Sequence, residues 1–140
     1  MGDEYRRPAA ATDEVVAAVG QVTEALEWVE RARGHLYDVH QMLGHADLLF
    51  GEAADALAEA GCVDEAALLR REVVGRNVLD GRWTFQVVDE FDDGYYQPVR
   101  VAERQVRDAL VAGRRHVHEA ELKDSRPTNG HPAHSRPTRS

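Results

Sequence analysis

The sequence predicts an all-α fold, an antiparallel helical bundle built on one long N-terminal helix. Large apolar residues recur every seven positions from Val15 to Leu57. Small residues, mostly alanine, recur three positions after each of them. The one stretch that alternates like a β-strand, Trp83–Val87, has no second strand to pair with. Together these observations favour helices packed along a heptad seam, in a chain of 140 residues that is typical of one domain.

The long helix is predicted from residue 13 to about residue 60. Thr12 is placed to cap its N-terminus, and Gly61 is placed to end it. Gly34 resembles a stop signal, but it falls on the outer face and leaves the heptad phase unchanged. We therefore expect one helix of about 48 residues, roughly 72 Å long, with a kink at Gly34 as the alternative. The two seam rows are Val15, Val22, Val29, Leu36, Leu43, Phe50 and Leu57, and Ala18, Ala25, Ala32, Val39, Ala46, Ala53 and Ala60.

Further helices are expected after Gly61. Asp64 is a candidate cap for a second helix that stops near the turn dipeptide Asp80-Gly81. Residues 82–97 are ambiguous between helix and loop, and helix is favoured. Gly94 and Pro98 weaken that helix, so we expect either a kink there or a new helix with Pro98 in its first turn. This last helix is predicted to run to about Leu122.

The domain organisation predicted from these elements has three parts. Residues 1–12 are expected to form a flexible arm, and residues 13–124 the helical-bundle domain. Residues 125–140 contain three prolines and no large apolar side chain, which predicts a disordered basic tail containing His131 and His134.

Composition excludes several classes of function. The formal charge of −8 argues against non-specific nucleic-acid binding. No apolar run reaches the about 18 residues of a membrane span, and no secretory signal is evident, so we expect a cytoplasmic protein without membrane contact. A single cysteine, Cys62, excludes an internal disulfide framework. Known phosphate-binding, dinucleotide, zinc-protease and serine-hydrolase motifs are missing, and no cofactor is expected.

The best candidate site is a row of side chains that directly follows the small seam residues. This row is apolar at both ends and polar in the middle, where Arg33, His40 and Asp47 follow one another at intervals of about 10.5 Å. Such side chains either form structural polar layers, the interpretation we favour, or bind a ligand with help from other segments. The ligand-binding candidates are Arg33, His40, Asp47, Arg76, Asn77 and Arg82, and the metal candidates are His40, Asp47, Asp92 and Asp93.

Function is expected to be noncatalytic, through self-association or binding of a protein partner, without excluding an enzyme. Residues 13–93 carry 18 acidic and 6 basic side chains, whereas residues 94–140 carry 5 acidic and 9 basic ones. Opposed charges of this kind attract each other within one chain or between two copies. A helix of this length also exceeds what the later helices are expected to cover, which predicts a homodimer. The alternative is a bundle that binds a small molecule or a divalent metal around His40.

Three segments resemble small uncharacterised proteins of actinobacteria. They are His35–Gln41, Gly75–Gln86 and Asp92–Tyr96, and the resemblance extends over most of residues 23–130. It agrees with a composition of 16 arginines, one lysine and no isoleucine, which is typical of GC-rich genomes. The resemblance implies a helical protein and no particular activity or functional residue.

Overall fold

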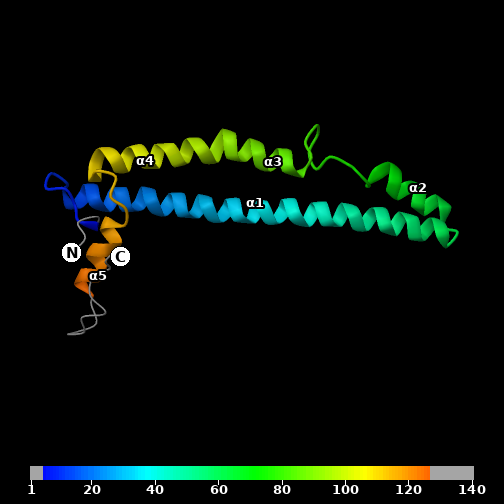
Figure 1. The fold of residues 1–140 in the computed structure, drawn as a ribbon, viewed down its shortest axis with the longest axis horizontal. Helices are drawn as coiled ribbons and strands as arrows, with labels where there is room; N and C mark the ends of the chain where they lie inside the picture. The colour runs from blue at the N-terminus through cyan, green and yellow to red at the C-terminus, as the bar shows by residue number, and fades with distance from the viewer. Residues whose placement is uncertain (1–4, 127–140) are drawn as a thin grey trace. The chain divides into compact units, whose positions relative to one another are not determined.

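The regular secondary structure is helical, which confirms the predicted all-α class. The structure is a computed structural model that describes residues 5–126. Its elements are α1 (Asp13–Glu59), α2 (Val63–Glu72), α3 (Thr84–Phe91), the π-helical η2 (Asp92–Tyr96), α4 (Gln97–Val111) and α5 (Val117–Ser125) (Figure 1). They divide into unit 1, Met1–Val29 with Gln97–Ser140, and unit 2, Glu30–Tyr96.

Helix α1 is continuous, as the heptads predict, and no kink interrupts it at Gly34 (Figure 1). Its N-terminus is capped by Thr12, whose Oγ1 accepts a hydrogen bond from the Val15 amide at 3.2 Å. Its C-terminus closes in a Schellman turn. The Cys62 amide donates to the Leu57 carbonyl and the Gly61 amide to the Ala58 carbonyl. Gly61 has the positive φ of +84° that this turn requires.

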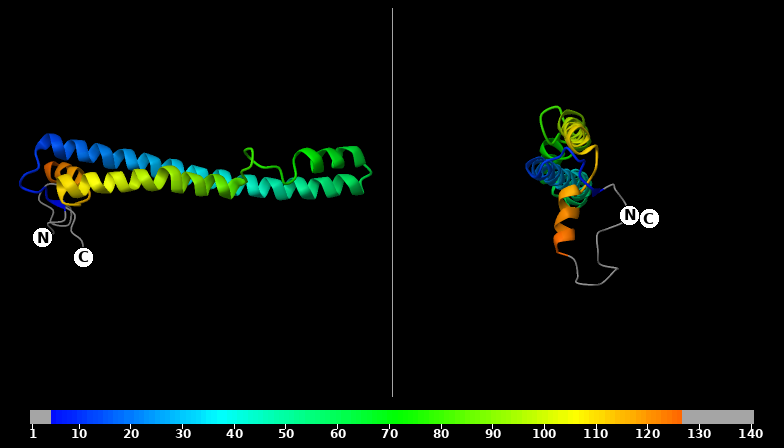
Figure 2. Two further views of the ribbon diagram at one scale, coloured as in Figure 1. Left: turned by 90° about the horizontal axis from the view of Figure 1, so that it is seen from above. Right: turned by 90° about the vertical axis from the view of Figure 1, so that its left-hand side faces the viewer.

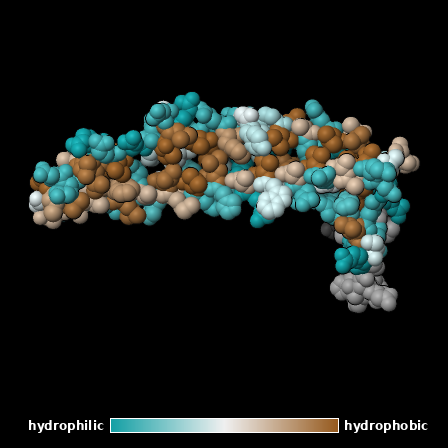
Figure 3. Space-filling model, turned by 180° about the vertical axis from the view of Figure 1, so that it is seen from behind, coloured by the Kyte–Doolittle hydropathy of each residue, from teal (hydrophilic) through white to brown (hydrophobic). Residues whose placement is uncertain are grey.

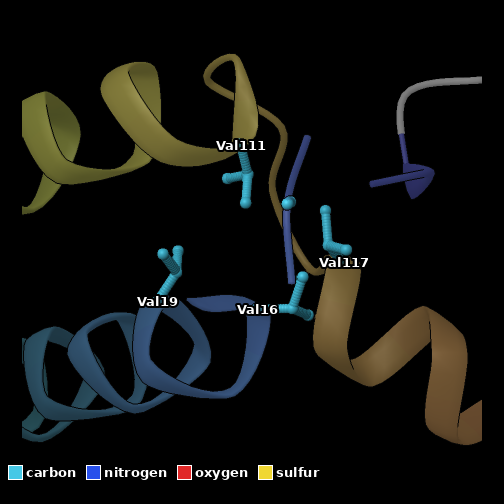
Figure 4. Packing of buried hydrophobic residues seen from close by; sticks show 5 residues of the cluster. Val16, Val19, Val111 and Val117 are labelled. Atoms are coloured by element: carbon cyan, nitrogen blue, oxygen red, sulfur yellow. The ribbon is translucent and has the colours of Figure 1, made fainter. Parts of the chain in front are cut away.

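Unit 1 packs α4 and α5 against the first part of α1. Four buried valines, Val16, Val19, Val111 and Val117, form its core together with Ala11 (Figure 4). Helix α4 runs antiparallel to α1, and the two lie side by side in Figures 1 and 2. Buried Glu103 on α4 accepts hydrogen bonds from Thr23 and from Arg107. A charged group can be buried there because its oxygens are paired.

The segment before α1 contacts α5 in unit 1. Arg7 binds Glu121 with two parallel hydrogen bonds of 2.7 and 2.8 Å, and it also binds Asp13 at 2.6 Å. Ala11 belongs to the core. The described part of the arm predicted over residues 1–12 therefore has specific contacts. The predicted tail, including His131 and His134, lies outside the described residues except for its first two positions.

Helix α2 in unit 2 differs from its prediction at both ends. It begins at Val63 with Cys62 as the N-cap residue, so Asp64 lies within the first turn and does not cap it. It ends at Glu72, well before Asp80. Three residues after this end, Gly75 adopts a φ of +73°, and its amide donates a hydrogen bond to the Asp47 carboxylate. The Asp80-Gly81 turn is present as expected, with Leu79 and Arg82 exchanging two backbone hydrogen bonds.

The last predicted helix is divided at two places. One lies just before Pro98, as the sequence suggested, and the other lies after Val111, where the sequence predicted no end. Pro98 is the second residue of α4, in its first turn as one of the two alternatives proposed, directly after η2. The wider π-helical turn tolerates a position where the proline offers no amide. The predicted continuation to Leu122 is wrong, because the helix ends at Val111. Ala112 and Gly113 have φ values of +53° and +72°, which reverse the chain before α5.

Candidate functional site

The polar row of α1 lies on the covered face of this helix in unit 2. Arg33, His40 and Asp47 are half-buried, and Ala54 in the same row is fully buried. The row of small seam residues, one position before each of these side chains, is mostly exposed. The intramolecular contacts therefore use the side of the heptad pattern that carries the polar residues.

Arg33 is the most extensively bound of these side chains. Its Nε and one terminal nitrogen donate to the two carboxylate oxygens of Asp92 at 2.7 and 2.9 Å. The guanidinium also lies 4.8 Å from the ring centres of Tyr37 and Tyr96, so it contacts two aromatic faces. These hydrogen bonds from Arg33 lower the pKa of the Asp92 carboxyl below its usual range. Helix α1 and η2 are thereby linked by a charge-assisted pair of fixed geometry.

His40 contacts the start of α3. Its Nδ1 lies 2.6 Å from Oγ1 of Thr84, and Thr84 is 3% exposed. The hydroxyl can donate to the ring or accept from it, so both groups satisfy part of their hydrogen-bonding capacity. This contact supports a structural role for His40.

Asp47 contacts the loop after α2. Its carboxylate accepts a hydrogen bond of 2.7 Å from the Gly75 amide. The three polar residues thus bind three successive segments of unit 2, in reverse chain order. Their partners are Asp92 in η2, Thr84 in α3 and Gly75 after α2. Such contacts fix the register of an antiparallel hairpin.

The other candidates lie apart from this row. Arg76 approaches Glu72 at 3.8 Å, Arg82 forms an ion pair with Glu90, and Asn77 is exposed. Asp92 binds Arg33, while the adjacent Asp93 is exposed. Within residues 5–126, the ligand atoms of His40, Asp47, Asp92 and Asp93 do not form a convergent metal-binding group. Ligand binding at any of these residues remains a prediction.

A second feature of unit 2 is an apolar surface on α1. Val39, Met42, Leu43, Leu49 and Phe50 are 44%, 62%, 37%, 50% and 42% exposed. We call these residues, together with Ala46 and Ala53, the apolar stripe. They recur at three- and four-residue intervals, so they share one face of the helix. Brown, apolar side chains gather on the surface of unit 2 in Figure 3.

A third feature was missed by sequence reasoning. In unit 1, ligand atoms of Glu27, His116 and Glu119 all lie within 4.8 Å of one another. Glu27 lies 89 residues before His116 and 92 residues before Glu119 in the sequence. Only the packing of α5 against α1 brings them together. The pair His116 and Glu119, three residues apart near a helix start, was the available local signal.

Comparisons with known proteins identify no relative of this chain. No protein-family model matches the chain, and no curated protein and no solved structure is detectably similar to it. Among the described residues, no helix combines the length and the apolar character needed to cross a membrane.

Proposed function

We propose that this protein is a noncatalytic helical protein that acts by self-association, and that a second copy of the chain covers the apolar stripe. The observation that supports the proposal is the exposure of Val39, Met42, Leu43, Leu49 and Phe50 on one continuous helical face. Leaving apolar side chains in water costs roughly 25 cal/mol for each Å² that an interface would bury.

A second copy fits the stripe because the stripe is complementary to itself. Its central position, Ala46, is small, and Ala53 is small one heptad later, whereas Met42 and Leu49 are long. Two such helices related by a two-fold axis place the long side chains of one over the alanines of the other. Alanine at these positions also permits a short distance between the helix axes.

The polar row argues for an assembly function over a reaction centred on His40. Arg33, His40 and Asp47 each bind a partner within unit 2, so their side chains are engaged in holding the fold. A cytoplasmic location is part of this proposal and is favoured by the single cysteine, Cys62.

Light scattering after gel filtration tests the proposal. We expect a dimer at tens of micromolar for the full chain and a monomer for the double variant Met42→Glu/Leu49→Glu, because four charges would be buried in the dimer. Leu48→Glu is the matched control. Leu48 is 67% exposed on the same helix but lies outside the stripe, so this variant should remain dimeric.

A monomeric wild-type protein at these concentrations would refute self-association. A dimer that persists in the double variant, with helix content unchanged by circular dichroism, would place the interface elsewhere.

A further inference from the structure

Three side chains that commonly bind metal ions converge in unit 1. Glu27 comes from α1, His116 is the N-cap residue of α5, and Glu119 lies in the first turn of α5. His116 Nδ1 is 3.5 Å from Glu119 Oε2. Ligands of one Zn²⁺ ion, each at about 2.0–2.2 Å from the metal, lie about 3–3.6 Å from one another. Side-chain rotations that shorten these distances would close the group, and both Glu27 and Glu119 are exposed.

The backbone holds His116 in an unusual position. Its φ of +59° is left-handed, a conformation that a residue with a Cβ rarely adopts. This conformation starts α5 and places the imidazole beside Glu119. Gly20 allows α5 to approach α1 closely, because a Cβ at position 20 would lie 3.0 Å from the His118 Cβ. The two helices are thus close enough for Glu27 to reach the α5 residues.

The group is open to solvent. A surface hollow adjoins it and is lined by Gly20, Glu24, Glu27, His118, Glu119 and Leu122. An ion can enter from this side, and water can complete its coordination. Three protein ligands and an open position are compatible with the coordination of Zn²⁺.

The charges of the group favour a cation. Glu27 and Glu119 are two carboxylates at short range, and Glu24 lines the same hollow. Their mutual repulsion is relieved when a divalent ion lies between them. The positive end of the α5 dipole and the nearby Arg114 repel a cation. Neither of them supplies an atom that would contact the bound ion.

We propose that Glu27, His116 and Glu119 form a binding site for a divalent transition-metal ion of the zinc class. The imidazole ligand selects such ions over Mg²⁺ and Ca²⁺, which prefer oxygen ligands. This site goes beyond self-association, since it lies in unit 1 and the apolar stripe lies in unit 2.

Isothermal titration of the full, untagged chain with Zn²⁺ tests the site, and the absorption spectrum of bound Co²⁺ reports the ligand geometry. We expect the single variants Glu27→Gln, His116→Asn and Glu119→Gln each to weaken the strongest Zn²⁺ binding by at least about tenfold. Asparagine is chosen at position 116 because it tolerates a left-handed backbone. Glu27→Gln is the variant least able to disturb folding, because Glu27 is exposed on a helix surface.

Two controls test three histidines that lie outside this site. His45→Asn changes an exposed histidine in unit 2 and should leave Zn²⁺ binding unchanged. The double variant His131→Asn/His134→Asn removes two histidines near the C-terminus and should also retain it. The proposal is overturned if the wild type does not bind Zn²⁺. It is equally overturned if the three site variants bind as tightly as the wild type, or if only the double variant loses binding.

Discussion

Single polar residues on the covered face of α1 hold specific segments of unit 2 in place. His40 shows this most directly, because its partner Thr84 is almost fully buried. We predict that His40→Leu lowers the free energy of unfolding by about 1–2 kcal/mol, because the Thr84 hydroxyl loses its partner away from water. Chemical denaturation of the wild type and of His40→Leu measures this effect.

The matched variant for that experiment is Thr84→Val, alone and combined with His40→Leu. Removing both polar groups leaves neither one unpaired, so the double variant should be more stable than the sum of the single effects implies. Additive losses would show that the 2.6 Å contact between the two side chains contributes no coupling.

The Arg33–Asp92 pair predicts a pH dependence of stability. Because Arg33 lowers the pKa of Asp92 in the folded state, the pair stabilises the fold fully above the ordinary aspartate pKa of about 3.9. That stabilisation is lost as the pH falls through the lowered folded-state pKa. Wild type and Asp92→Asn should therefore differ in stability near pH 6 and converge in acid. Asp93→Asn alters the exposed neighbour and should follow the wild-type curve more closely.

At the scale of one element, two glycines within α1 have opposite surroundings. A Cβ at Gly34 meets nothing within 4 Å, whereas a Cβ at Gly20 meets His118. We predict that Gly34→Ala raises the free energy of unfolding by about 0.5–1 kcal/mol, since alanine is the better helix former. Gly20→Ala gains the same propensity but has to displace α5, and should be at least about 1 kcal/mol less stable than Gly34→Ala. Thermal denaturation compares the two directly, and equal stabilities would contradict close packing at Gly20.

The heptads identified α1 correctly but could not tell which side of it faces inward. Arg33, His40 and Asp47 lie on the covered side because each has a partner more than 20 residues away. Periodicity reports apolar side chains and is insensitive to such pairs. The ends of the later helices were harder to predict from the sequence. Helix α2 ends at Glu72, three residues before Gly75 binds Asp47, and α4 ends at Val111, directly before the left-handed Ala112. Both ends depend on tertiary contacts or on backbone strain that the local sequence does not reveal.

At the scale of the whole molecule, charge and apolar surface act in opposite directions on self-association. Unit 2 carries 14 acidic and 6 basic side chains, and it also carries the apolar stripe. Two copies joined through unit 2 repel each other electrostatically, and salt screens that repulsion. We predict that raising NaCl from about 0.05 to 0.5 M tightens the proposed dimer several-fold, measured by sedimentation equilibrium. Weaker association at high salt would instead indicate attraction between ion pairs across the interface.

The order of the three polar contacts in unit 2 restricts how such a chain can change in length. Moving along α1 from Arg33 to His40 and Asp47 means moving backward from Asp92 to Thr84 and Gly75. An insertion between Arg33 and His40 moves these two residues further apart along α1. The spacing between their partners, Asp92 and Thr84, stays the same. Only a matching insertion between Thr84 and Asp92 restores both contacts. Natural variation in the length of these two segments should therefore occur in pairs, whereas the loop between Gly75 and Thr84 can lengthen on its own.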